Sequence, residues 1–599
     1  MNIRRISRSG PQTHNVDEKE FRSHRFQTIK RLWKELAQKK GRLLFVLFFV
    51  ATNATLGVLG PLFIGKTVDH IIYDGGENIF LFLLGLVCVY LFYSITAYLQ
   101  NYWMISISQE TVYRLRKRLF EHIQRLPISF FDRKQHGELM SRFTNDMDNV
   151  SSTLNSSVIH IFSSVLTVVG TFIVMIWLSP LLTMITLLVV PVMFFGMRWI
   201  TNRTGKLFRE QQKYLGELNG YIEETVSGQK IVKTYSYEQE TMEQFLEKSK
   251  RLREAGYWAQ TYSGFIPKLM NLLNNASFAF IALAGGILAM NGHVSIGVMI
   301  SFTEYARQFT RPLNELANQF NTLLSAIAGA ERVFDIMDEE AEDEDDREGD
   351  VEILQGNVTF SHVYFSYENA DSTISDMNFH VQPGQMVALV GPTGAGKSTI
   401  IHLIMRFYDC DSGAILVDGR NIQQISRSSL RKNIGFVLQD VFLFEGTIRE
   451  NIRYGRLDAT DEEVEEAAKR ANAHSFIMRL PQGYDTVLTE DASGISQGQK
   501  QLLSIARAIL RNPSILILDE ATSNIDTVTE MKIQEALQQL MKGRTTFCIA
   551  HRLNTIRHAH QIFVINDGKL IEKGTHDSLI EAHGYYYDLY NQLSRKDVG

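Results

Sequence analysis

Eight consecutive residues, Gly391–Ser398, read GPTGAGKS and fit the spacing G-x-x-x-x-G-K-[ST] of a phosphate-binding loop. The apolar run Met386–Val390 before them predicts a buried strand, and the periodic segment Thr399–Tyr408 after them predicts a helix. Backbone N–H groups of such a loop and of the helix N-terminus surround a polyphosphate. An accidental match in a glycine-rich turn is the alternative, and the strand–loop–helix context disfavours it. The predicted nucleotide contacts are Gly391, Pro392, Thr393, Gly394, Ala395, Gly396, Lys397, Ser398 and Thr399.

Within this loop, two side chains have distinct expected roles. Lys397 would reach the β- and γ-phosphates, and the Ser398 hydroxyl would ligate Mg²⁺. A second stretch, Ser514–Glu520, reads SILILDE and predicts a buried strand that ends in two acids. Asp519 would hold Mg²⁺ opposite Ser398, directly or through water, and Glu520 would deprotonate an attacking water. A solvated acidic pair is the alternative, and the phosphate loop upstream favours the catalytic interpretation.

Three further residues are weak signals when each is taken alone. His551 follows the apolar run Thr546–Ala550 and would contact a γ-phosphate, although a capping or surface histidine has the same pattern. Gln439, in VLQD, is likewise a polar side chain that follows an apolar run. Tyr367, in FSY, would stack on adenine, with a core tyrosine as the alternative.

The N-terminal half consists largely of long apolar runs. Five uncharged runs approach or exceed the ~20 residues that cross a bilayer: Leu43–Ile64, Ile79–Ile107, Val158–Trp177, Leu181–Met197 and Leu269–Met290. A sixth run, from about Val294, is interrupted by charges. The count of six rests partly on topology, because an even number returns the C-terminal half to the N-terminal side. These runs predict a polytopic α-helical membrane domain.

The loops between the runs predict its orientation. The short segments Ile71–Asn78, Leu178–Pro180 and Asn291–His293 contain no Lys or Arg, whereas the long connections Gln109–Val150 and Arg198–Tyr257 are rich in both. Because positive loops stay on the cytoplasmic side, both termini and the phosphate loop are predicted to be cytoplasmic, in a multi-pass protein of the cell membrane.

The N-terminus reads as a mobile tail over residues 1–25, followed by a basic amphipathic helix, Phe26–Lys40. No short apolar core or small-residue cleavage site is present, so no signal peptide is predicted. The helix suits the inner membrane surface, with an ordinary solvated helix as the alternative. Its apolar positions, at helical spacing among Lys and Arg, are Ile29, Leu32, Trp33 and Leu36.

Composition narrows the function classes. A net charge of -5 over 599 residues leaves no global basic field for nucleic acid. The cysteines, Cys88, Cys410 and Cys548, lack metal-site spacing and a disulfide framework. The acidic run Asp338–Asp350 marks a linker, and after it short β-branched runs alternate with helices. The predicted domains are a tail and amphipathic helix (1–40), a transmembrane domain (41–330), a linker (331–352) and a nucleotide-binding domain (353–599).

In their order along the chain, these motifs resemble the nucleotide-binding domain of ATP-binding cassette (ABC) transporters. They are Tyr367 as A-loop, GPTGAGKS as Walker A, Gln439 as Q-loop, ISQGQKQ as signature, ILILDE as Walker B, SNID as D-loop and His551 as H-loop. Six spans fused before such a domain are similar to a bacterial half-transporter of the exporter type. FFDRKQHGELMSRFTNDMDNV and EETVSGQKIVKTY look like the regions of its two coupling helices, and the resemblance covers about Arg31–Leu593.

The resemblance implies a type I exporter membrane domain plus an α/β P-loop ATPase, with ATP and Mg²⁺ as cofactors. Two such ATPase domains sandwich ATP between the Walker A of one subunit and the signature of the other. Glu520 is then the general base and His551 its partner at the γ-phosphate, while Gln439 senses the metal and the attacking water. The opposite subunit's ATP is served by Ser496, Gly498 and Gln499, with Asp526 in the D-loop.

One departure from the family pattern concerns the signature. The usual LSGGQ is here ISQGQ, with Gln497 in place of the first glycine. A side chain there intrudes where backbone N–H groups approach the γ-phosphate. With the Walker motifs, Glu520 and His551 intact, this pattern resembles one subunit of the heterodimeric multidrug exporters, in which one ATP site is hydrolytic and the other degenerate. Neutral drift in a homodimer is the alternative.

The sequence does not name the cargo. Asn271, Asn274 and Asn275 share one helix face, as do Glu304, Arg307 and Arg311, and such polar groups face a cavity or neighbouring helices. The prediction is ATP-driven export of small amphipathic compounds, with membrane lipids and a second, related half-transporter as partners and no nucleic acid. The alternatives are a homodimeric lipid or lipid A flippase, and a nucleotide-gated channel or sensor.

Overall fold

The computed structural model describes residues 18–73, 75, 79–342, 355–367, 373–438, 441–489, 494–519, 525–550 and 556–597. The chain divides into two compact units. The first contains Met1–Gln124 and His136–Glu339, and the second contains Arg125–Gln135 and Glu340–Gly599. A short segment from the N-terminal half therefore belongs to the unit that carries the phosphate loop.

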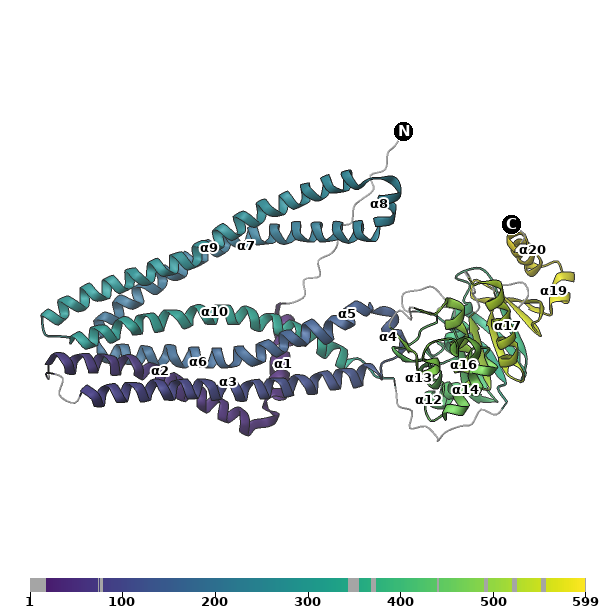
Figure 1. Ribbon diagram of the computed structural model, residues 1–599, viewed down its shortest axis with the longest axis horizontal. Helices are drawn as coiled ribbons and strands as arrows, with labels where there is room; N and C mark the ends of the chain where they lie inside the picture. The colour runs from purple at the N-terminus through teal and green to yellow at the C-terminus, as the bar shows by residue number, and fades with distance from the viewer. Residues whose placement is uncertain are drawn as a thin grey trace. The chain divides into compact units, whose positions relative to one another are not determined.

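The first unit is helical, and six of its helices are long (Figure 1). Its helices are α1 (Glu18–Leu36), α2 (Lys40–Tyr73), α3 (Ile79–Ile123), α5 (His136–Ser141), α6 (Met147–Leu178), α7 (Pro180–Ser227), α8 (Gln229–Tyr235), α9 (Glu238–Met290) and α10 (Ile296–Asp338), with a 3₁₀ turn at Ala37–Lys39 and a π-helical turn at Arg142–Asp146. The amphipathic helix thus starts earlier than predicted, inside the supposed tail, and ends at Leu36.

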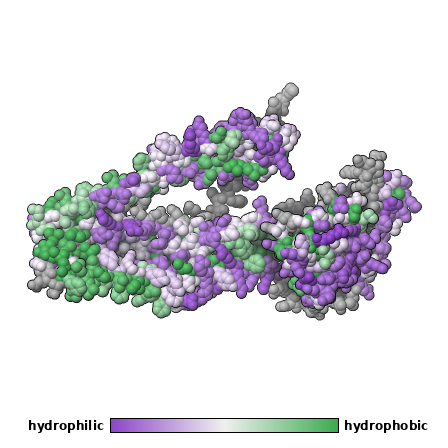
Figure 2. Space-filling view, viewed as in Figure 1, coloured by the Kyte–Doolittle hydropathy of each residue, from purple (hydrophilic) through white to green (hydrophobic). Residues whose placement is uncertain are grey.

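Among the described residues, four helical stretches are long and apolar enough to cross a membrane: Phe26–Tyr73, Ile79–Ile123, His136–Leu178 and Glu238–Met290. The predicted run Leu181–Met197 lies on α7, and the interrupted sixth run lies on α10. Figure 2 shows apolar side chains gathered over the end of this unit where α9 turns into α10. The apolar surface fits a membrane-embedded domain.

Small residues and buried hydroxyls let α2 and α10 approach closely. A Cβ on Gly297 would lie 2.0 Å from the carbonyl oxygen of Gly65, so neither helix tolerates bulk there. One turn further on, Ser301 Oγ donates to Pro61 O at 2.7 Å, and Tyr305 OH donates to Val58 O at 2.6 Å. Such packing and interhelical hydrogen bonds hold helices together where water does not drive association.

The helices α7 and α9 form an antiparallel pair that also packs against α10 and α6. They pack along each other, whereas α2 packs against α3, α6 and α10. In Figure 1 this pair diverges from the other long helices toward α8. Its far part leaves apolar side chains exposed, among them Ile222, Val226, Met242 and Leu246.

The buried carboxylate of Asp146 connects the π-helical turn before α6 to α10. Asp146 is 3% exposed, and it accepts hydrogen bonds from Arg142 Nη1 at 2.9 Å and from Arg332 Nε at 3.1 Å. Arg332 Nη2 donates to its other oxygen. A buried carboxylate of this kind is stable only because both arginines supply hydrogen bonds and charge.

The second unit contains a six-stranded sheet in the order β12-β11-β3-β10-β9-β6 and a four-stranded antiparallel sheet in the order β2-β1-β4-β5. Within the six-stranded sheet, β11, β3, β10, β9 and β6 run parallel, and β12 pairs antiparallel with β11. A short antiparallel pair, β7–β8, lies apart. The strands are β1 (Val358–Phe365), β2 (Ile374–Val381), β3 (Met386–Val390), β4 (Ser412–Val417), β5 (Arg420–Asn421), β6 (Ile434–Val437), β7 (Gly446–Thr447), β8 (Val487–Leu488), β9 (Ile515–Asp519), β10 (Thr545–Ile549), β11 (Gln561–Asn566) and β12 (Lys569–Gly574).

The parallel strands are buried on both faces, as their unbroken apolar sequences predict. One face of β3 contributes Ala388 and Val390 to a core shared with α14, α16 and α17, and the other contributes Val387 and Leu389 to a core shared with α11 and the four-stranded sheet. The helices of this unit are α4 (Ile128–Arg133), α11 (Lys397–Ile404), α12 (Arg427–Lys432), α13 (Ile448–Arg453), α14 (Asp461–Arg470), α15 (His474–Ile477), α16 (Gln497–Arg511), α17 (Thr527–Met541), α19 (His576–Glu581) and α20 (Tyr585–Asp597).

The Asp146 cluster gives a stability prediction. Asp146→Asn is expected to lower the free energy of unfolding by roughly 2 kcal/mol, because two arginines lose a buried anionic partner. Thermal unfolding of the purified protein in detergent, followed by circular dichroism, measures the change. The matched control is Asp148→Asn, since the Asp148 side chain is 71% exposed in its pair with Arg116 and the change should stay below about 0.5 kcal/mol. Equal effects of both substitutions would contradict the buried-cluster interpretation.

Candidate nucleotide-binding site

Three parallel strands end level with one another beside the phosphate loop. Ile549 of β10 is in register with Leu389 of β3 on one side and with Asp519 of β9 on the other. The loop Gly391–Ser398 follows β3 directly, and α11 starts at Lys397. The predicted strand before the loop is confirmed, while the helix after it is shorter than Thr399–Tyr408. The level edge places Asp519 two strands from the loop, at the end of the sheet where ligands bind in open α/β folds.

Close contacts with neighbouring residues explain why two positions of the loop must be glycine. A Cβ on Gly391 would lie 2.1 Å from the Ile565 carbonyl oxygen, and one on Gly396 would lie 2.8 Å from Ile374 Cδ1. Gly396 also has a φ of +101°, which favours glycine. Gly394, at the loop tip with a φ of +84°, has no atom within 4 Å of a built Cβ. The loop is therefore closely packed against Ile565 and Ile374, whereas its tip at Gly394 is open. This arrangement would let its backbone N–H groups surround a phosphate.

Lys397 is poised under this loop. It is 8% exposed, and its Nζ donates to Gly391 O at 2.9 Å and to Pro392 O at 2.8 Å. Burial lowers the pKa of Lys397 below its ordinary range, and the charge of Asp519 opposes that shift. A phosphate anion at the loop would supply the charge partner that two neutral carbonyls do not. Ser398 is exposed, Thr399 is buried, and Pro392 and Thr393 are exposed at the mouth, with Ala395 buried beneath them.

The structure places Tyr367 in an aromatic cluster beside α11. Its hydroxyl lies 3.3 Å from Thr399 Oγ1 and 3.2 Å from His402 Nδ1. Its ring makes edge-to-face contacts with Phe365 and Tyr408, at centroid distances of 4.9 and 5.0 Å. Tyr367 is thus half-buried, in the manner of the core tyrosine that was the alternative, while adjoining the loop helix. His402 is a neighbour that sequence reasoning missed, and the only signal was a polar residue in an apolar helix.

The signature residues form the N-terminus of α16. Ser496 caps the helix: its Oγ accepts from Gln499 N at 3.3 Å, and Gln499 Oε1 accepts from Ser496 N at 2.9 Å. Such a helix N-terminus attracts anions. Gln497 is exposed at the first helical position, whereas Gly498 is buried and a Cβ there would lie 2.4 Å from Thr529 Cγ2. Gly498 therefore has a packing role within its own chain, which the sequence alone did not reveal.

Of the remaining predicted residues, Asp526 lies in the described part of the chain and three others do not. Asp526 caps α17, and its Oδ2 accepts from Thr529 N at 2.9 Å, a bond that lowers the pKa of Asp526. Gln439, Glu520 and His551 lie outside the described residues. They follow β6, β9 and β10 in the sequence, and these strands are neighbours in the sheet. Their roles stay predictions.

The protein oxygens at this site could hold Mg²⁺ only if phosphate oxygens complete its coordination. Within the described ranges, no three His, Cys, Asp or Glu side chains gather into a metal-binding group. The candidate ligands are the Ser398 hydroxyl and the Asp519 carboxylate, both oxygen donors. Mg²⁺ is commonly held by one or two protein oxygens together with substrate phosphates and water, and it would there neutralise phosphate charge.

The segment Arg125–Gln135, which belongs to this unit, contacts the nucleotide-binding fold directly. Tyr408 OH donates to Oδ2 of Asp132, a residue of α4, at 2.6 Å, and the Tyr408 ring also contacts the Tyr367 ring. Burial raises the pKa of Tyr408, and the Asp132 carboxylate raises it further, so the phenol stays protonated as the donor. An aromatic path thus joins α4 to the residues around α11. Sequence reasoning assigned this region to a coupling helix but did not identify Tyr408.

Comparisons with known proteins match both parts of the chain. Residues 43–313 match the family model of the ABC transporter transmembrane region, and residues 374–523 match that of the ABC transporter. The uncharacterized ABC transporter ATP-binding protein YfiC of Bacillus subtilis is 60% identical over 95% of this chain and 94% of its own length. A fatty acid ABC transporter ATP-binding/permease protein of Mycobacterium bovis is 44% identical over 80% of this chain and 76% of its own. The putative multidrug export ATP-binding/permease protein YgaD of Bacillus subtilis is 35% identical over 94% and 98%.

The fold and the loop geometry define a membrane protein in which a helical domain is fused to a P-loop ATPase. With these matches, the chain belongs to the ABC transporter family, as a half-transporter of the exporter kind. The predicted fold class is confirmed, and so is an ATPase domain that binds ATP in the service of transport. ABC exporters act as dimers, so the chain works with a second half-transporter.

Lys397 gives a direct test of the site. Lys397→Ala is expected to weaken ATP binding about 10- to 100-fold, because a charge-assisted contact to phosphate contributes roughly 1.5–3 kcal/mol. Titration of the purified protein with a fluorescent ATP analogue measures the affinity. The matched control, Lys469→Ala, removes an exposed lysine on α14 and should leave the affinity unchanged. Unchanged affinity for Lys397→Ala would overturn the assignment of Lys397 as the phosphate contact.

Proposed function

We propose that the chain exports small amphipathic compounds across the cytoplasmic membrane by ATP-driven alternating access, as one subunit of a heterodimer. The observation that carries this proposal is the pairing of a complete phosphate loop with an altered signature. Lys397 and Asp519 lie together at the loop edge, whereas Gln497 presents a side chain at the exposed start of α16. One ATP site of the dimer is then hydrolytic and the other degenerate.

In this mechanism the chain's own groups divide the work. The loop backbone and Lys397 hold the β- and γ-phosphates, with the open tip at Gly394 facing the nucleotide. Glu520, which directly follows β9, removes a proton from the attacking water, and His551, the partner of Glu520, contacts the γ-phosphate. Gln439 senses the metal and the water. Tyr367 would contact adenine. One face of its ring must then be open to the base, although the ring also belongs to the aromatic cluster.

The signature of this chain would serve the ATP that is bound by the partner subunit. The N-terminus of α16 offers a helix dipole and the Ser496 hydroxyl, whose oxygen already accepts from Gln499 N and whose proton remains available to a phosphate. Gln497 adds bulk at the same exposed helix start. Because backbone N–H groups must approach the γ-phosphate closely there, the side chain favours a composite site that binds ATP but hydrolyses it poorly.

The exposed far part of the α7–α9 pair supports a dimer. Its exposed apolar residues around α8 need a partner surface, because large exposed apolar patches mark interaction sites. The region of α8 is proposed as the second coupling helix, and α4, through Tyr408 and Asp132, as part of the first. Nucleotide-driven closure must favour the closed state by about 5.5 kcal/mol to convert the population almost fully.

The cargo class rests on the membrane domain and on the relatives. A putative multidrug exporter and a fatty acid transporter are both similar to this chain, and both names fit amphipathic cargo. A homodimeric lipid or lipid A flippase is the second candidate, and it is favoured if the chain alone is active. A nucleotide-gated channel or sensor is the third, and Glu520 argues against it because a sensor does not need a general base. We also propose that the termini and the ATPase domain lie in the cytoplasm, because the long, positively charged connections predict this orientation.

Glu520→Gln tests the proposed base. The substitution keeps size and hydrogen bonding but cannot accept the proton, so turnover should fall by about 10²- to 10⁴-fold while bound ATP is retained. Phosphate release and retention of labelled ATP by the assembled transporter measure both effects. The control, Glu466→Gln, changes an exposed acid on α14 and should hydrolyse ATP normally. Near-normal hydrolysis by Glu520→Gln would remove the base assignment.

Gln497→Gly tests the degenerate site. Restoring the glycine removes the side chain at the start of α16, so ATPase activity or its cooperativity in ATP should rise in the assembled transporter. Gln497→Ala is the matched control, because it removes the amide but keeps the Cβ that obstructs close approach. Identical rates and Hill coefficients for wild type and both variants would favour neutral drift of the signature in a homodimer.

A further inference from the structure

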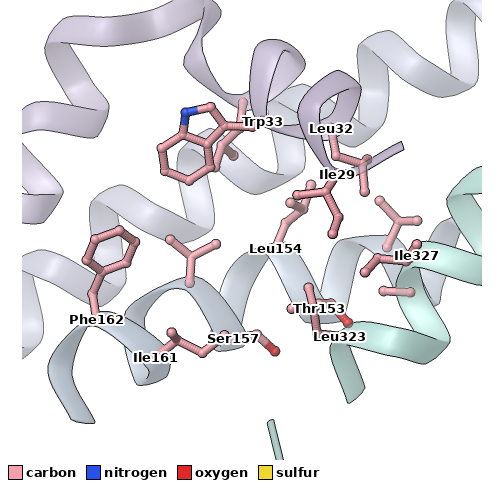
Figure 3. Close-up of a pocket in the computed structure, with 14 residues that line it drawn as sticks. Ile29, Leu32, Trp33, Thr153, Leu154, Ser157, Ile161, Phe162, Leu323 and Ile327 are labelled. Carbon is pink, nitrogen blue, oxygen red and sulfur yellow. The ribbon is translucent and has the colours of Figure 1, made fainter. Parts of the chain in front are cut away.

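A cavity of about 180 Å³ lies in the membrane domain between α1, α6 and α10. Figure 3 shows side chains from all three helices pointing into it. Leu32 and Leu36 of α1 are buried in its wall, opposite Leu154 of α6 and Ile327 of α10. Its volume exceeds the roughly 150 Å³ that holds a benzene molecule in an engineered apolar cavity. The cavity therefore has room for part of a hydrocarbon chain.

The wall chemistry excludes a polar ligand inside the cavity. Almost all of the lining is apolar, and of its two hydroxyl groups that of Ser157 already donates to Gln319 Oε1 at 2.7 Å. Its mouth is aromatic: the Trp33 and Phe162 rings lie 6.5 Å apart at an interplanar angle of 26°. Trp33 is 42% exposed and Ile29 40% exposed, so this side of the cavity opens outward. Amphipathic aromatic rings of this kind are typical of the membrane interface.

Two exposed lysines are sequence neighbours of residues that line the mouth. Lys30 and Lys34 are exposed on α1, one turn apart, and each directly follows a cavity residue, Ile29 and Trp33 respectively. Neither lysine has an ion pair among the described side chains, whereas the intervening Arg31 is paired with Asp338. An apolar cavity on a helix that also carries these two exposed lysines is complementary to an amphiphile with a negative headgroup.

We propose that this cavity binds the acyl chain of an anionic phospholipid, whose headgroup lies against Lys30 and Lys34. The cavity lies where the apolar run of α6 begins, at Val158, so an acyl chain of the adjacent leaflet can enter between Trp33 and Phe162. The bound lipid fastens α1 to α6 and α10. Binding of the lipid at this site does not depend on ATP hydrolysis.

Trp33 is a built-in reporter for this site. In a variant that keeps only this tryptophan, with Phe at Trp103, Trp177, Trp199 and Trp258, phosphatidylglycerol carrying bromine near the head of its acyl chains should quench the fluorescence. The protein is titrated in detergent with trace amounts of brominated lipid, so that bulk collisions are few. The expected result is saturable quenching near one lipid per chain, with brominated phosphatidylcholine at least about tenfold weaker.

Charge and volume variants test whether lipid binding depends on the two lysines and on the space in the cavity. Lys30→Gln with Lys34→Gln should weaken phosphatidylglycerol about tenfold, to the level of phosphatidylcholine. The matched control, Lys206→Gln with Lys250→Gln, removes the same charge from exposed sites on α7 and α9 and should have no effect. Ala326→Leu should fill the cavity and abolish saturable quenching, with its thermal midpoint as the check on folding.

Three outcomes would overturn the proposal. The first is equal quenching by phosphatidylglycerol and phosphatidylcholine that does not change when Lys30 and Lys34 are replaced by Gln. The second is the absence of saturable quenching in wild-type protein. The third is a cysteine placed at Ile29 that crosslinks to a second copy with high yield, which would show that protein and not lipid covers the cavity. Loss of ATPase or transport activity leaves the binding readout unaffected, so the proposal stands or falls separately from the proposed function.

Discussion

The parallel hydrogen bonds that join β3, β10 and β9 determine where the chemistry of this chain takes place. They bring Leu389, Ile549 and Asp519 level, so the phosphate loop, the end of β10 and the carboxylate of Asp519 share one edge. Burial on both sides of these strands fixes the register, because a slip by one residue would exchange the two cores. The proposed roles of Glu520 and His551 depend on the same edge, since each residue follows one of these strands.

Local sequence predicted the parts of this site that depend on local structure. The strand Met386–Val390 and the glycine loop could be predicted because burial and loop geometry require particular residue types within a few positions. Contacts between distant segments could not be predicted. Nothing near Tyr408 in the sequence indicates that it meets Asp132, and nothing in the signature reveals that Gly498 packs on Thr529. The roles of Gln439, Glu520 and His551 come from the family motif order together with their positions after predicted strands, and these roles stay predictions.

The membrane domain shows the same division. Long uncharged runs predicted helices, yet the start of α1 was missed because its polar first turns carry no apolar period. The glycine contact between α2 and α10 depends on two helices that are far apart in the sequence. We propose that the second half-transporter of the dimer covers the α7–α9 pair, since apolar side chains of this pair are exposed within the described part of the chain. Function in this family therefore lies partly outside a single chain.

The measurement that tests the account most directly is the ATPase activity of this chain purified alone in lipid vesicles, with Glu520→Gln as the control. The heterodimer account predicts folded protein that binds ATP but turns it over little, with turnover restored by a related subunit that carries an intact signature. Robust hydrolysis by the single chain, abolished by Glu520→Gln, would contradict the account and establish a working homodimer.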